Sequence, residues 1–592
     1  MAFRLALALA LGASLFQAAV AQTYNELYRP QYHFTPAKNW MNDPNGLLYY
    51  NGVYHLYYQY NPGGDTWGAM SWGHATSTDL THWNHQPVAL LARGYPDHIT
   101  EMFFSGSAVA DTQNTSGFGT DGKVPLVALY TSYYPDSQKL PSGKSVNGGQ
   151  QAQSIAYSVD EGMTWTTYDA ANPVILNPPA PYEDQWREFR DPFLFWHEAS
   201  EKWISVVALA QLHKLVIYTS PNLKDWTYAS EFGPWNAVGG VWECPGIFPL
   251  AVDGDDANTK WVVQIGVNPG GPPGVTGSGT QYILGSFDGT KFVADPNPSS
   301  PALTSTSTTA PETGDITVQD SEGTDGTNWL DYGPDFYAAA TFNGLASTNR
   351  IDIAWMNNWQ YANIIPTSPW RSMLSIARKL SLKTIDGRPR LVQQPTANWA
   401  SLQTEAYSDT FDTVAEGNQL VPISGKLLDI TVTFSDRVAA SSSSQFGIIL
   451  RATSDLAQQT RIGYDFSTKM LFVDRTKSGN VGFDGTFSNT YSAPLAPSSD
   501  GNVTMRILLD WSSVEVFGGQ GRVTISAQIF PEDNGVDVRL FSDGESTNDV
   551  TIDAKMLDSA YDSSTPSRTT LRTSSTPVGT TLTTSTRTTT SI

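Results

Sequence analysis

The sequence predicts an all-β protein, a five-bladed β-propeller followed by a C-terminal β-sandwich, and three observations support this fold class. The 592 residues include 18 Trp, 26 Tyr and 25 Phe beside 49 Gly and 36 Pro, a composition that favours strands and turns over helices. A turn that carries an acidic residue and leads into a pair of strands recurs along the first two thirds of the chain. Beyond Pro395 the pattern changes to alternating strands joined by polar loops, which is typical of a β-sandwich.

The acidic turns define the blades of the predicted propeller. They read WMNDPNG with Asp43, FRDP with Asp191 and WECPG with Glu243. A weaker copy at 333–335 and the strand at 103–109 bring the count to five units. One such unit for each four-stranded sheet is the pattern that a propeller gives.

Radial repetition would bring these acids together although they are far apart in the sequence. The blades of a propeller surround a central channel, so equivalent positions of successive blades lie at the same end of it. A single Asp-Pro turn mostly caps a hairpin. Three acidic copies flanked by Trp, Arg and Asn indicate instead a shared site.

The rest of the chain is predicted to contain a leader, an insertion and a tail. Arg4, an apolar run and a small-residue cleavage sequence before Gln22 have the form of a secretory signal. The predicted parts are a signal peptide (1–21), a catalytic propeller (22–395) with a low-complexity insertion (about 294–327), a β-sandwich (396–562) and a disordered, O-glycosylated Ser/Thr-rich tail (563–592).

Charge and cysteine content exclude several classes of partner. A net charge of −22 and a sequence pI near 4.7 argue against nucleic acid and against an anionic membrane, and are compatible with an uncharged substrate such as a sugar. Cys244 is the single cysteine, so the secreted chain is expected to have no internal disulfide.

Asn114 and Asn502 begin acceptable N-glycosylation sequons. We expect no metal site, and a monomer or a weak homo-oligomer.

The acids suggest a glycosidase, because two carboxylates that flank a glycosidic bond are its catalytic apparatus. Backbone amides of the turn after Asp43 would favour its ionised form. Glu243 is followed by Cys244 and Pro245, which bring little charge and suit a proton donor. Arg190 would form a charge pair that keeps the adjacent Asp191 ionised and fixed.

Four motifs in order, WMNDPNG, FSGS at 104–107, FRDP and WECPG, resemble glycoside hydrolase family 32, the β-fructofuranosidases. The resemblance extends from about residue 28 to about residue 552, and the stretches 268–279 and 355–361 are most similar to secreted fungal exo-inulinases. It implies a five-bladed propeller joined to a sandwich, retaining hydrolysis of terminal β-D-fructofuranosyl groups, and no metal or cofactor.

The resemblance also implies roles for individual residues. Asp43 corresponds to the nucleophile, Glu243 to the acid/base and Asp191 to the transition-state stabiliser. The corresponding substrate contacts are Asn42, Gln59, Trp67, Ser105, Arg190 and Trp359. The alternative is structural: the two tryptophans could belong to the core, and the glutamine could simply satisfy a backbone group.

Three functions remain open from the sequence. The first is a secreted exo-inulinase that removes fructose from inulin, levan and sucrose, and the second is an invertase that prefers sucrose. The third, from a different class, is a non-catalytic fructan-binding propeller, which would be marked by loss of one of the three acids. All three acids are present, which favours an enzyme. The expected partners are fructan and sucrose substrates, with no nucleic acid and no membrane.

Overall fold

The computed structural model describes residues 24–296, 326–436, 445–544, 546–561 and 570–571. Strands account for most of this part of the chain, and the predicted all-β fold class is confirmed. The predicted signal peptide (1–21), most of the insertion (294–327) and most of the tail (563–592) lie outside the described residues. No helix within the described ranges is long and apolar enough to cross a membrane.

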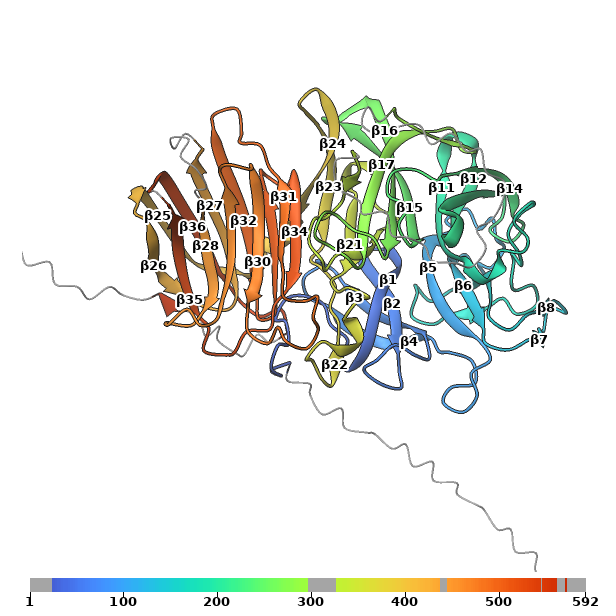
Figure 1. The fold of residues 1–592 in the computed structure, drawn as a ribbon. Helices are drawn as coiled ribbons and strands as arrows, with labels where there is room; N and C mark the ends of the chain where they lie inside the picture. Colours follow the sequence, from blue (N-terminus) through green and yellow to red (C-terminus); the bar gives the residue numbers. More distant parts are fainter. Residues whose placement is uncertain (1–23, 297–325, 437–444, 545, 562–569, 572–592) are drawn as a thin grey trace, which may run out of the picture.

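The sheets of the first domain make up five blades of four main strands each. This domain, from β1 to β24, lies on the right in Figure 1. The innermost strands of the blades, β1, β5, β11, β15 and β20, contact one another in sequence, and β20 contacts β1, so the ring is closed. The inner edge of each blade is therefore short and protected by the neighbouring blades. The blades are β1 (Asn39–Tyr50), β2 (Val53–Asn61), β3 (Ser71–Ser77) and β4 (Asn84–Leu90); β5 (Met102–Ala110), β6 (Leu126–Tyr134), β9 (Gln150–Ser158) and β10 (Thr166–Thr167); β11 (Phe189–His197), β12 (Lys202–Leu209), β13 (Lys214–Ser220) and β14 (Thr227–Phe232); β15 (Val241–Val252), β16 (Asp255–Asn268), β17 (Gly279–Phe287) and β18 (Phe292–Ala294); and β20 (Tyr337–Thr341), β21 (Ile351–Trp355), β23 (Arg378–Ile385) and β24 (Arg388–Pro395).

Short elements extend the blades. A parallel bridge between Val252 and Leu382 joins the fourth and fifth blades into one sheet. The other pieces are β7 (Gln138–Lys139), β8 (Ser145–Val146), β19 (Asn328–Trp329), β22 (Trp370–Arg371) and the 3-10 turns η1 (Trp186–Glu188), η2 (Glu198–Ser200), η3 (Ala210–Leu212), η4 (Ser347–Asn349), η5 (Ala362–Ile364) and η6 (Ala397–Leu402).

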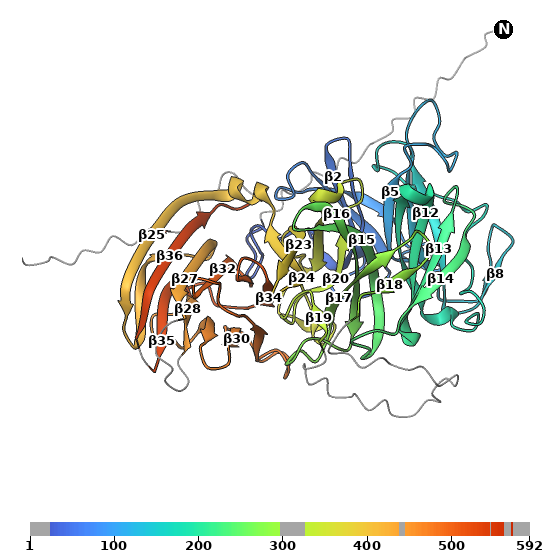
Figure 2. The same ribbon diagram turned by 90° about the horizontal axis from the view of Figure 1, so that it is seen from above.

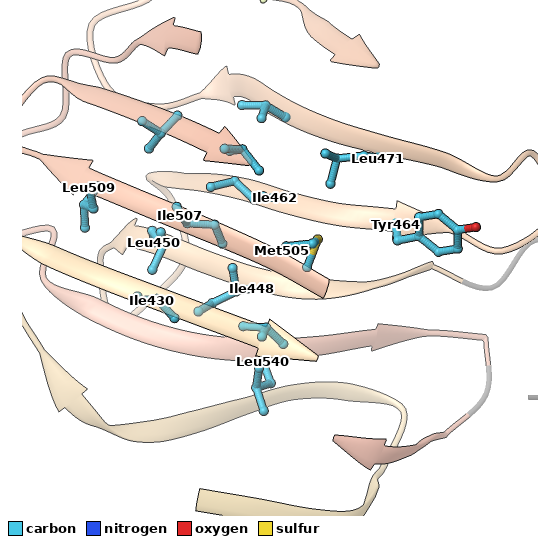
Figure 3. Packing of buried hydrophobic residues seen from close by; sticks show 14 of the residues in the cluster. Ile430, Ile448, Leu450, Ile462, Tyr464, Leu471, Met505, Ile507, Leu509 and Leu540 are labelled. Carbon is cyan, nitrogen blue, oxygen red and sulfur yellow. The ribbon is translucent and has the colours of Figure 1, made fainter. Parts of the chain in front are cut away.

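Two antiparallel sheets form the second domain, which lies beside the propeller (Figures 1 and 2). Alternating apolar residues of both sheets meet in one core, where Ile430 and Ile507 of one sheet face Ile448 and Leu450 of the other (Figure 3). The sheets consist of β25 (Gln403–Val414), β36 (Thr547–Leu557), β27 (Leu428–Ser435), β32 (Asn502–Asp510), β33 (Ser513–Gly518) and β34 (Val523–Gln528), and of β31 (Thr490–Pro494), β30 (Met470–Lys477), β29 (Gln459–Asp465), β28 (Gln445–Ala452), β35 (Asp537–Asp543), β26 (Gly417–Ser424) and β37 (Thr570–Leu571).

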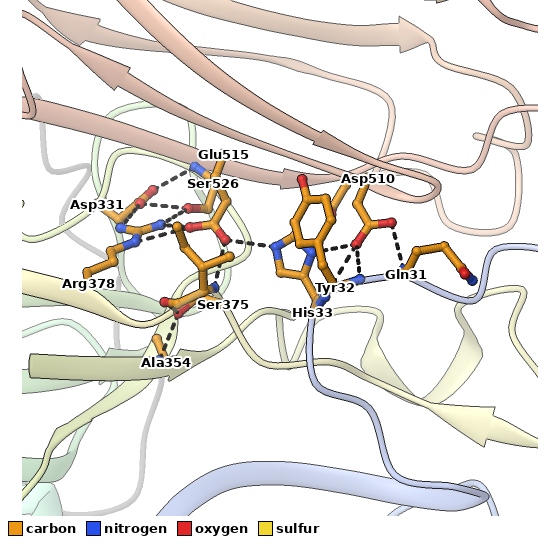
Figure 4. Close-up of polar contacts among 12 residues, drawn as sticks. Gln31, Tyr32, His33, Asp331, Ala354, Ser375, Arg378, Asp510, Glu515 and Ser526 are labelled. Atoms are coloured by element: carbon orange, nitrogen blue, oxygen red, sulfur yellow. Dashed lines mark hydrogen bonds and ion pairs between the residues drawn. The ribbon is translucent and has the colours of Figure 1, made fainter. Parts of the chain in front are cut away.

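A buried ionic network joins the two domains (Figure 4). The His33 ring, in the segment before β1, lies 2.9 Å from Asp510 Oδ2 and 2.8 Å from Glu515 Oε1 of the sandwich. Arg378 of β23 forms ion pairs with Glu515 and, at 3.0 Å, with Asp331. All five side chains are fully buried, so each charge depends on its partners because water cannot reach it.

The two predicted glycosylation sites occupy different surroundings. Asn114 is exposed in a turn after β5, whereas Asn502 is half-buried at the first position of β32. N-glycosylation at both positions stays a prediction.

Candidate active site

A β-bulge interrupts each of the five inner strands close to its first residue. A bulge places two residues opposite one and turns nearby side chains out of the alternating pattern of a strand. Five bulges at the same end of a closed ring therefore direct side chains toward a common space. The register shifts lie between Met41 and Pro44, Phe103 and Gly106, Arg190 and Phe193, Glu243 and Gly246, and Tyr337 and Ala340.

Three of these bulges contain a residue with left-handed backbone geometry. The φ angle is 63° at Asp191, 49° at Cys244 and 51° at Ala338. L-residues other than glycine disfavour this region, and such strain persists where the surrounding structure enforces it, often at functional sites. Within β11, β15 and β20 the left-handed residues therefore lie at the end where the acids lie.

Asp43 accepts hydrogen bonds from three inner-blade side chains. Asn42 Nδ2 lies 3.0 Å from its Oδ1, while Ser105 Oγ of β5 lies 2.6 Å from its Oδ2. The Cys244 thiol of β15 donates to the same Oδ2 at 3.4 Å. The first, second and fourth blades therefore fix one carboxylate, which is buried.

Asp191 lies on the other side of the same thiol. Its Oδ2 accepts the backbone N–H of Cys244 at 2.9 Å and is 3.7 Å from Cys244 Sγ. Its own backbone N–H donates to Thr131 Oγ1 at 2.9 Å. Cys244 thus links Asp191 to Asp43, and the convergence that the repeat predicted for these acids is present in the structure.

Glu243 completes the group from β15. Arg190 of β11 donates to its Oε1 at 2.9 Å, and the Tyr337 hydroxyl of β20 donates to its Oε2 at 2.6 Å. Arg190 also pairs with Glu188 and is 3.8 Å from Asp191 Oδ2. One guanidinium is therefore shared among three carboxylates.

Burial corrects two electrostatic expectations. Loss of hydration raises the pKa of Asp191 to about 7, and the neighbouring carboxylates Glu243 and Asp43 add to this rise against the opposing charge of Arg190. Burial likewise raises the pKa of Asp43, although the hydrogen bond from Ser105 opposes the shift. The expectation that a charge pair with Arg190 keeps Asp191 ionised is therefore wrong. The hydrogen bonds to Asp43 come from side chains and not from the amides of the following turn.

The Cys244 thiol is held neutral by the same environment. Burial raises its pKa well above the ordinary value, and the adjacent carboxylates raise it further. A neutral thiol can donate a weak hydrogen bond but does not act as a nucleophile. Cys244 therefore serves as a spacer between two acids.

Two predicted substrate contacts, Trp359 and Trp67, differ in how deeply they are buried. Trp359 lies with its ring 5.8 Å from that of Trp40, whose indole N–H donates to Asn42 Oδ1 at 2.8 Å. Trp67 is 41% exposed and meets Phe104 edge to face at 6.2 Å. Trp67 is therefore a surface aromatic and not a core tryptophan, whereas Trp359 lies half-buried against the indole that orients Asn42.

Gln59 makes a structural contact. Its Nε2 donates to the backbone oxygen of Phe103 at 3.0 Å, and the residue is buried. This bond ties β2 of the first blade to β5 of the second, next to the bulge that carries Ser105. A substrate contact for Gln59 stays a prediction.

A separate hollow lies at the opposite end of the ring. A cavity of about 710 Å³ is lined by the later residues of the inner strands, including Tyr49, Phe195 and Pro249, and by Trp261 and Arg350. None of the three acids lines it. Within the described ranges, no group of three His, Cys, Asp or Glu side chains is arranged to hold a metal ion.

Tyr337 is the site residue that the sequence analysis missed. It follows the weak fourth copy of the acidic turn, and that repeat could have identified it: the first strand of the fifth blade must also deliver a side chain to the common space. Attention to acids alone concealed a hydroxyl donor at the equivalent position.

Comparisons with known proteins agree with this geometry. Models of the glycosyl hydrolases family 32 N-terminal domain and of its C-terminal domain match residues 33–395 and 398–556. The chain is 56% identical to an extracellular exo-inulinase of Aspergillus niger, over 92% of this chain and 97% of that protein. It is 44% identical to a levanase of Bacillus subtilis, over 89% and 70% of the two chains.

Solved structures give the same answer. The crystal structure of an exo-inulinase from Aspergillus awamori superposes with a TM-score of 0.84 at 55% identity, and the match covers 91% of this chain and 99% of that one. A β-fructofuranosidase from Schwanniomyces occidentalis superposes with a TM-score of 0.74 at 31% identity, with 90% and 98% covered. The chain therefore belongs to glycosyl hydrolases family 32.

Proposed function

We propose that this protein is a secreted exo-inulinase that removes terminal β-D-fructofuranosyl groups from inulin, levan and sucrose with retention of configuration. The observation that carries the proposal is the convergence of Asp43, Asp191 and Glu243 around Cys244 and Arg190. The similarity to proteins named extracellular exo-inulinases and levanase supports the substrate class and the secretion. A monomer or a weak homo-oligomer stays a prediction.

In the first step Asp43 attacks the substrate. Its carboxylate oxygen forms a bond to the anomeric carbon of the terminal fructosyl group, while Glu243 gives its proton to the glycosidic oxygen. The bond between that carbon and the leaving oxygen breaks, and the shortened chain or glucose departs. Asn42, Ser105 and Cys244 hold the attacking carboxylate in one orientation.

In the second step water releases fructose. Glu243, now ionised, takes a proton from a water molecule whose oxygen bonds to the anomeric carbon, and the bond to Asp43 breaks. Arg190 and Tyr337 bind the two oxygens of Glu243 and keep them in place through both steps. Asp191 accepts hydrogen bonds from fructose hydroxyls, which strengthen as charge develops in the transition state.

Product analysis tests the proposal. We expect the wild-type protein to release fructose alone from inulin early in the reaction, and also to cleave levan and sucrose. Asp43→Asn and Glu243→Ala should each lower kcat by about three orders of magnitude or more. Asp253→Asn, at an exposed hairpin tip where the carboxylate contacts Thr384, is the matched acidic control and should retain wild-type activity.

Each other outcome selects a different function. Short oligofructosides as first products would mean endo-cleavage, and sucrose cleavage with intact inulin would mean an invertase. Binding of inulin without cleavage by the wild-type protein would establish the non-catalytic propeller. Full activity of either acid variant would overturn the assignment of that residue.

A further inference from the structure

A second buried network connects the sandwich to the propeller, at a residue that stands two positions before Tyr337. Arg475 of β30 donates to Asp335 Oδ2 at 2.8 Å and to the Tyr361 hydroxyl at 3.0 Å. Gln528 of β34 donates through its backbone N–H to Asp335 Oδ2 at 2.8 Å, and through Nε2 to Asn357 Oδ1 at 3.0 Å. Arg475, Asp335 and Gln528 are fully buried.

The propeller residues in this network belong to two segments, 334–337 and 357–361. Polar contacts also tie the segments to each other. The Tyr361 hydroxyl donates to Asp335 Oδ1 at 2.7 Å, and Asn358 Nδ2 donates to the Pro334 carbonyl at 2.8 Å. The two segments therefore form one unit that rests on the sandwich.

Each segment carries a side chain of the active site. Tyr337 stands two residues after Asp335, and its hydroxyl donates to Glu243 Oε2 at 2.6 Å. Trp359 stands between Asn358 and Gln360, and its backbone N–H donates to Ser278 Oγ at 3.2 Å. The position of both side chains thus follows from the position of the unit.

From Trp359 the contacts continue to the nucleophile. Its ring is stacked on Trp40, the Trp40 N–H donates to Asn42 Oδ1 at 2.8 Å, and Asn42 Nδ2 donates to Asp43 Oδ1 at 3.0 Å. An unbroken series of contacts therefore leads from the sandwich to Asp43 by one route and to Glu243 by the other.

Stability alone does not account for this arrangement. A buried ion pair is costly to desolvate, and well-packed apolar residues of similar volume often stabilise an interface equally well or better. What a network of directional bonds adds is a single geometry. Reactions are sensitive to geometry, since a misplacement of about 1 Å can cost roughly a hundredfold in rate.

We propose that Arg475 and Gln528 of the sandwich are positioning residues for the reaction in the propeller. They fix the unit formed by 334–337 and 357–361, and the unit places Tyr337 on Glu243 and Trp359 on Trp40. The sandwich thereby determines the orientation of both reacting carboxylates. The proposal rests on the proposed function, because it assigns these residues to the same catalytic site.

Conservative variants of the full chain test it. Gln528→Met keeps the volume and the backbone N–H but removes the side-chain bonds, and Arg475→Lys keeps the charge but loses the fork that binds two partners. We expect kcat on sucrose to fall about tenfold in Gln528→Met and further in Arg475→Lys, with KM raised severalfold. The alkaline limb of the pH profile should move in the same direction as in Tyr337→Phe.

His33→Gln is the matched control. It removes the ring contacts of His33 with Asp510 and Glu515, and within the described part of the chain the hydrogen bonds of the His33 side chain include none with 334–337 or 357–361. We expect this variant to lower Tm while kcat and the pH profile stay at wild-type values. The proposal is overturned if Gln528→Met and Arg475→Lys likewise lower Tm but leave kcat, KM and the pH profile at wild-type values. If Arg475→Lys fails to fold, Gln528→Met alone decides.

Hydrogen exchange separates this proposal from the proposed function. The backbone amides of 334–337 and 357–361 should exchange faster in Gln528→Met than in wild type. In His33→Gln their exchange rates should equal those of wild type. Both results are expected whatever substrate the protein cleaves. If exchange is faster in Gln528→Met than in wild type, and the wild-type protein leaves inulin and sucrose intact, the proposed function is refuted and the structural coupling is kept. Equal exchange in all three proteins would refute the coupling.

Discussion

At the scale of single residues, the site combines carboxylates in a way that costs stability. Glu188, Asp191 and Glu243 all share Arg190, and Asp43 is joined to Asp191 through Cys244. Burying carboxylates with too little opposing charge disfavours their ionised forms. The fold tolerates this cost because a preorganised polar site stabilises charge that develops during the reaction.

We predict that Asp191→Asn stabilises the protein at alkaline pH while it abolishes activity. Burial raises the pKa of Asp191 to about 7 from its ordinary 3.8. Between these values folding takes up a proton, so the contribution of Asp191 to stability is full below about pH 4 and is lost as pH rises through 7. Tm should therefore exceed that of wild type by a few degrees at pH 8 and match it at pH 4. A Tm difference that does not change with pH would contradict this.

At the scale of elements, a bulge near the first residue of every inner strand changes the direction of the adjacent side chains. Ala338 occupies this position in β20 directly after Tyr337, at a φ of 51° and with 1% exposure. We expect this left-handed residue to set the direction of the Tyr337 side chain, whose hydroxyl donates to Glu243 Oε2 at 2.6 Å. The bulge in β20 and the hydrogen bond from Tyr337 to Glu243 are thus expected to depend on each other.

Substitutions at Ala338 test this coupling. Glycine has no penalty at positive φ, so Ala338→Gly should leave activity intact and change stability by about 1 kcal/mol or less. A β-branched residue is strongly disfavoured there, so Ala338→Val should lower stability by roughly 1–3 kcal/mol and reduce kcat through displacement of Tyr337. Thermal melts and sucrose kinetics of both variants test this prediction. Equal kcat values for the two variants would refute the link between the backbone at Ala338 and the position of Tyr337.

At the scale of the whole molecule, the N-terminal segment, the propeller and the sandwich behave as one assembly (Figure 4). His33 sits between Asp510 and Glu515, stacks on Tyr32 and has Ser513 Oγ at 3.4 Å. Bonds to the two carboxylates raise the pKa of His33 to about 9, although burial opposes the rise. Imidazolium is therefore the form that joins the domains.

The pH dependence of unfolding follows from this pKa. The ordinary pKa of histidine is 6.5, so the protonated His33 contributes fully to the free energy of unfolding below about pH 6.5. This contribution, roughly 3 kcal/mol at most, is lost as pH rises through 9. Wild-type stability should thus decline between pH 7 and 9.5, and His33→Gln should decline less over the same range. Denaturant titrations measure this, and parallel declines would contradict it.

Periodicity made much of the fold predictable. The recurrence of WMNDPNG, FRDP and WECPG indicated both the blades and the convergence of Asp43, Asp191 and Glu243, because equivalent positions of a radial repeat meet. Alternation after Pro395 indicated the sandwich. The expectations that Asp43 and Asp191 are held ionised were wrong, since burial is a property of the assembled site and local neighbours do not reveal it.

The sequence by itself therefore determined the fold class, the family and the identity of the three converging acids, since local motifs and their repetition along the chain indicate each of these. Only the tertiary structure decided which groups hold those acids. The contacts of Tyr337 with Glu243, of Cys244 with Asp43 and of Arg475 with Asp335 join residues that are between 94 and 201 positions apart. Such pairs arise from closure of the ring and docking of the sandwich, and no local sequence pattern encodes them.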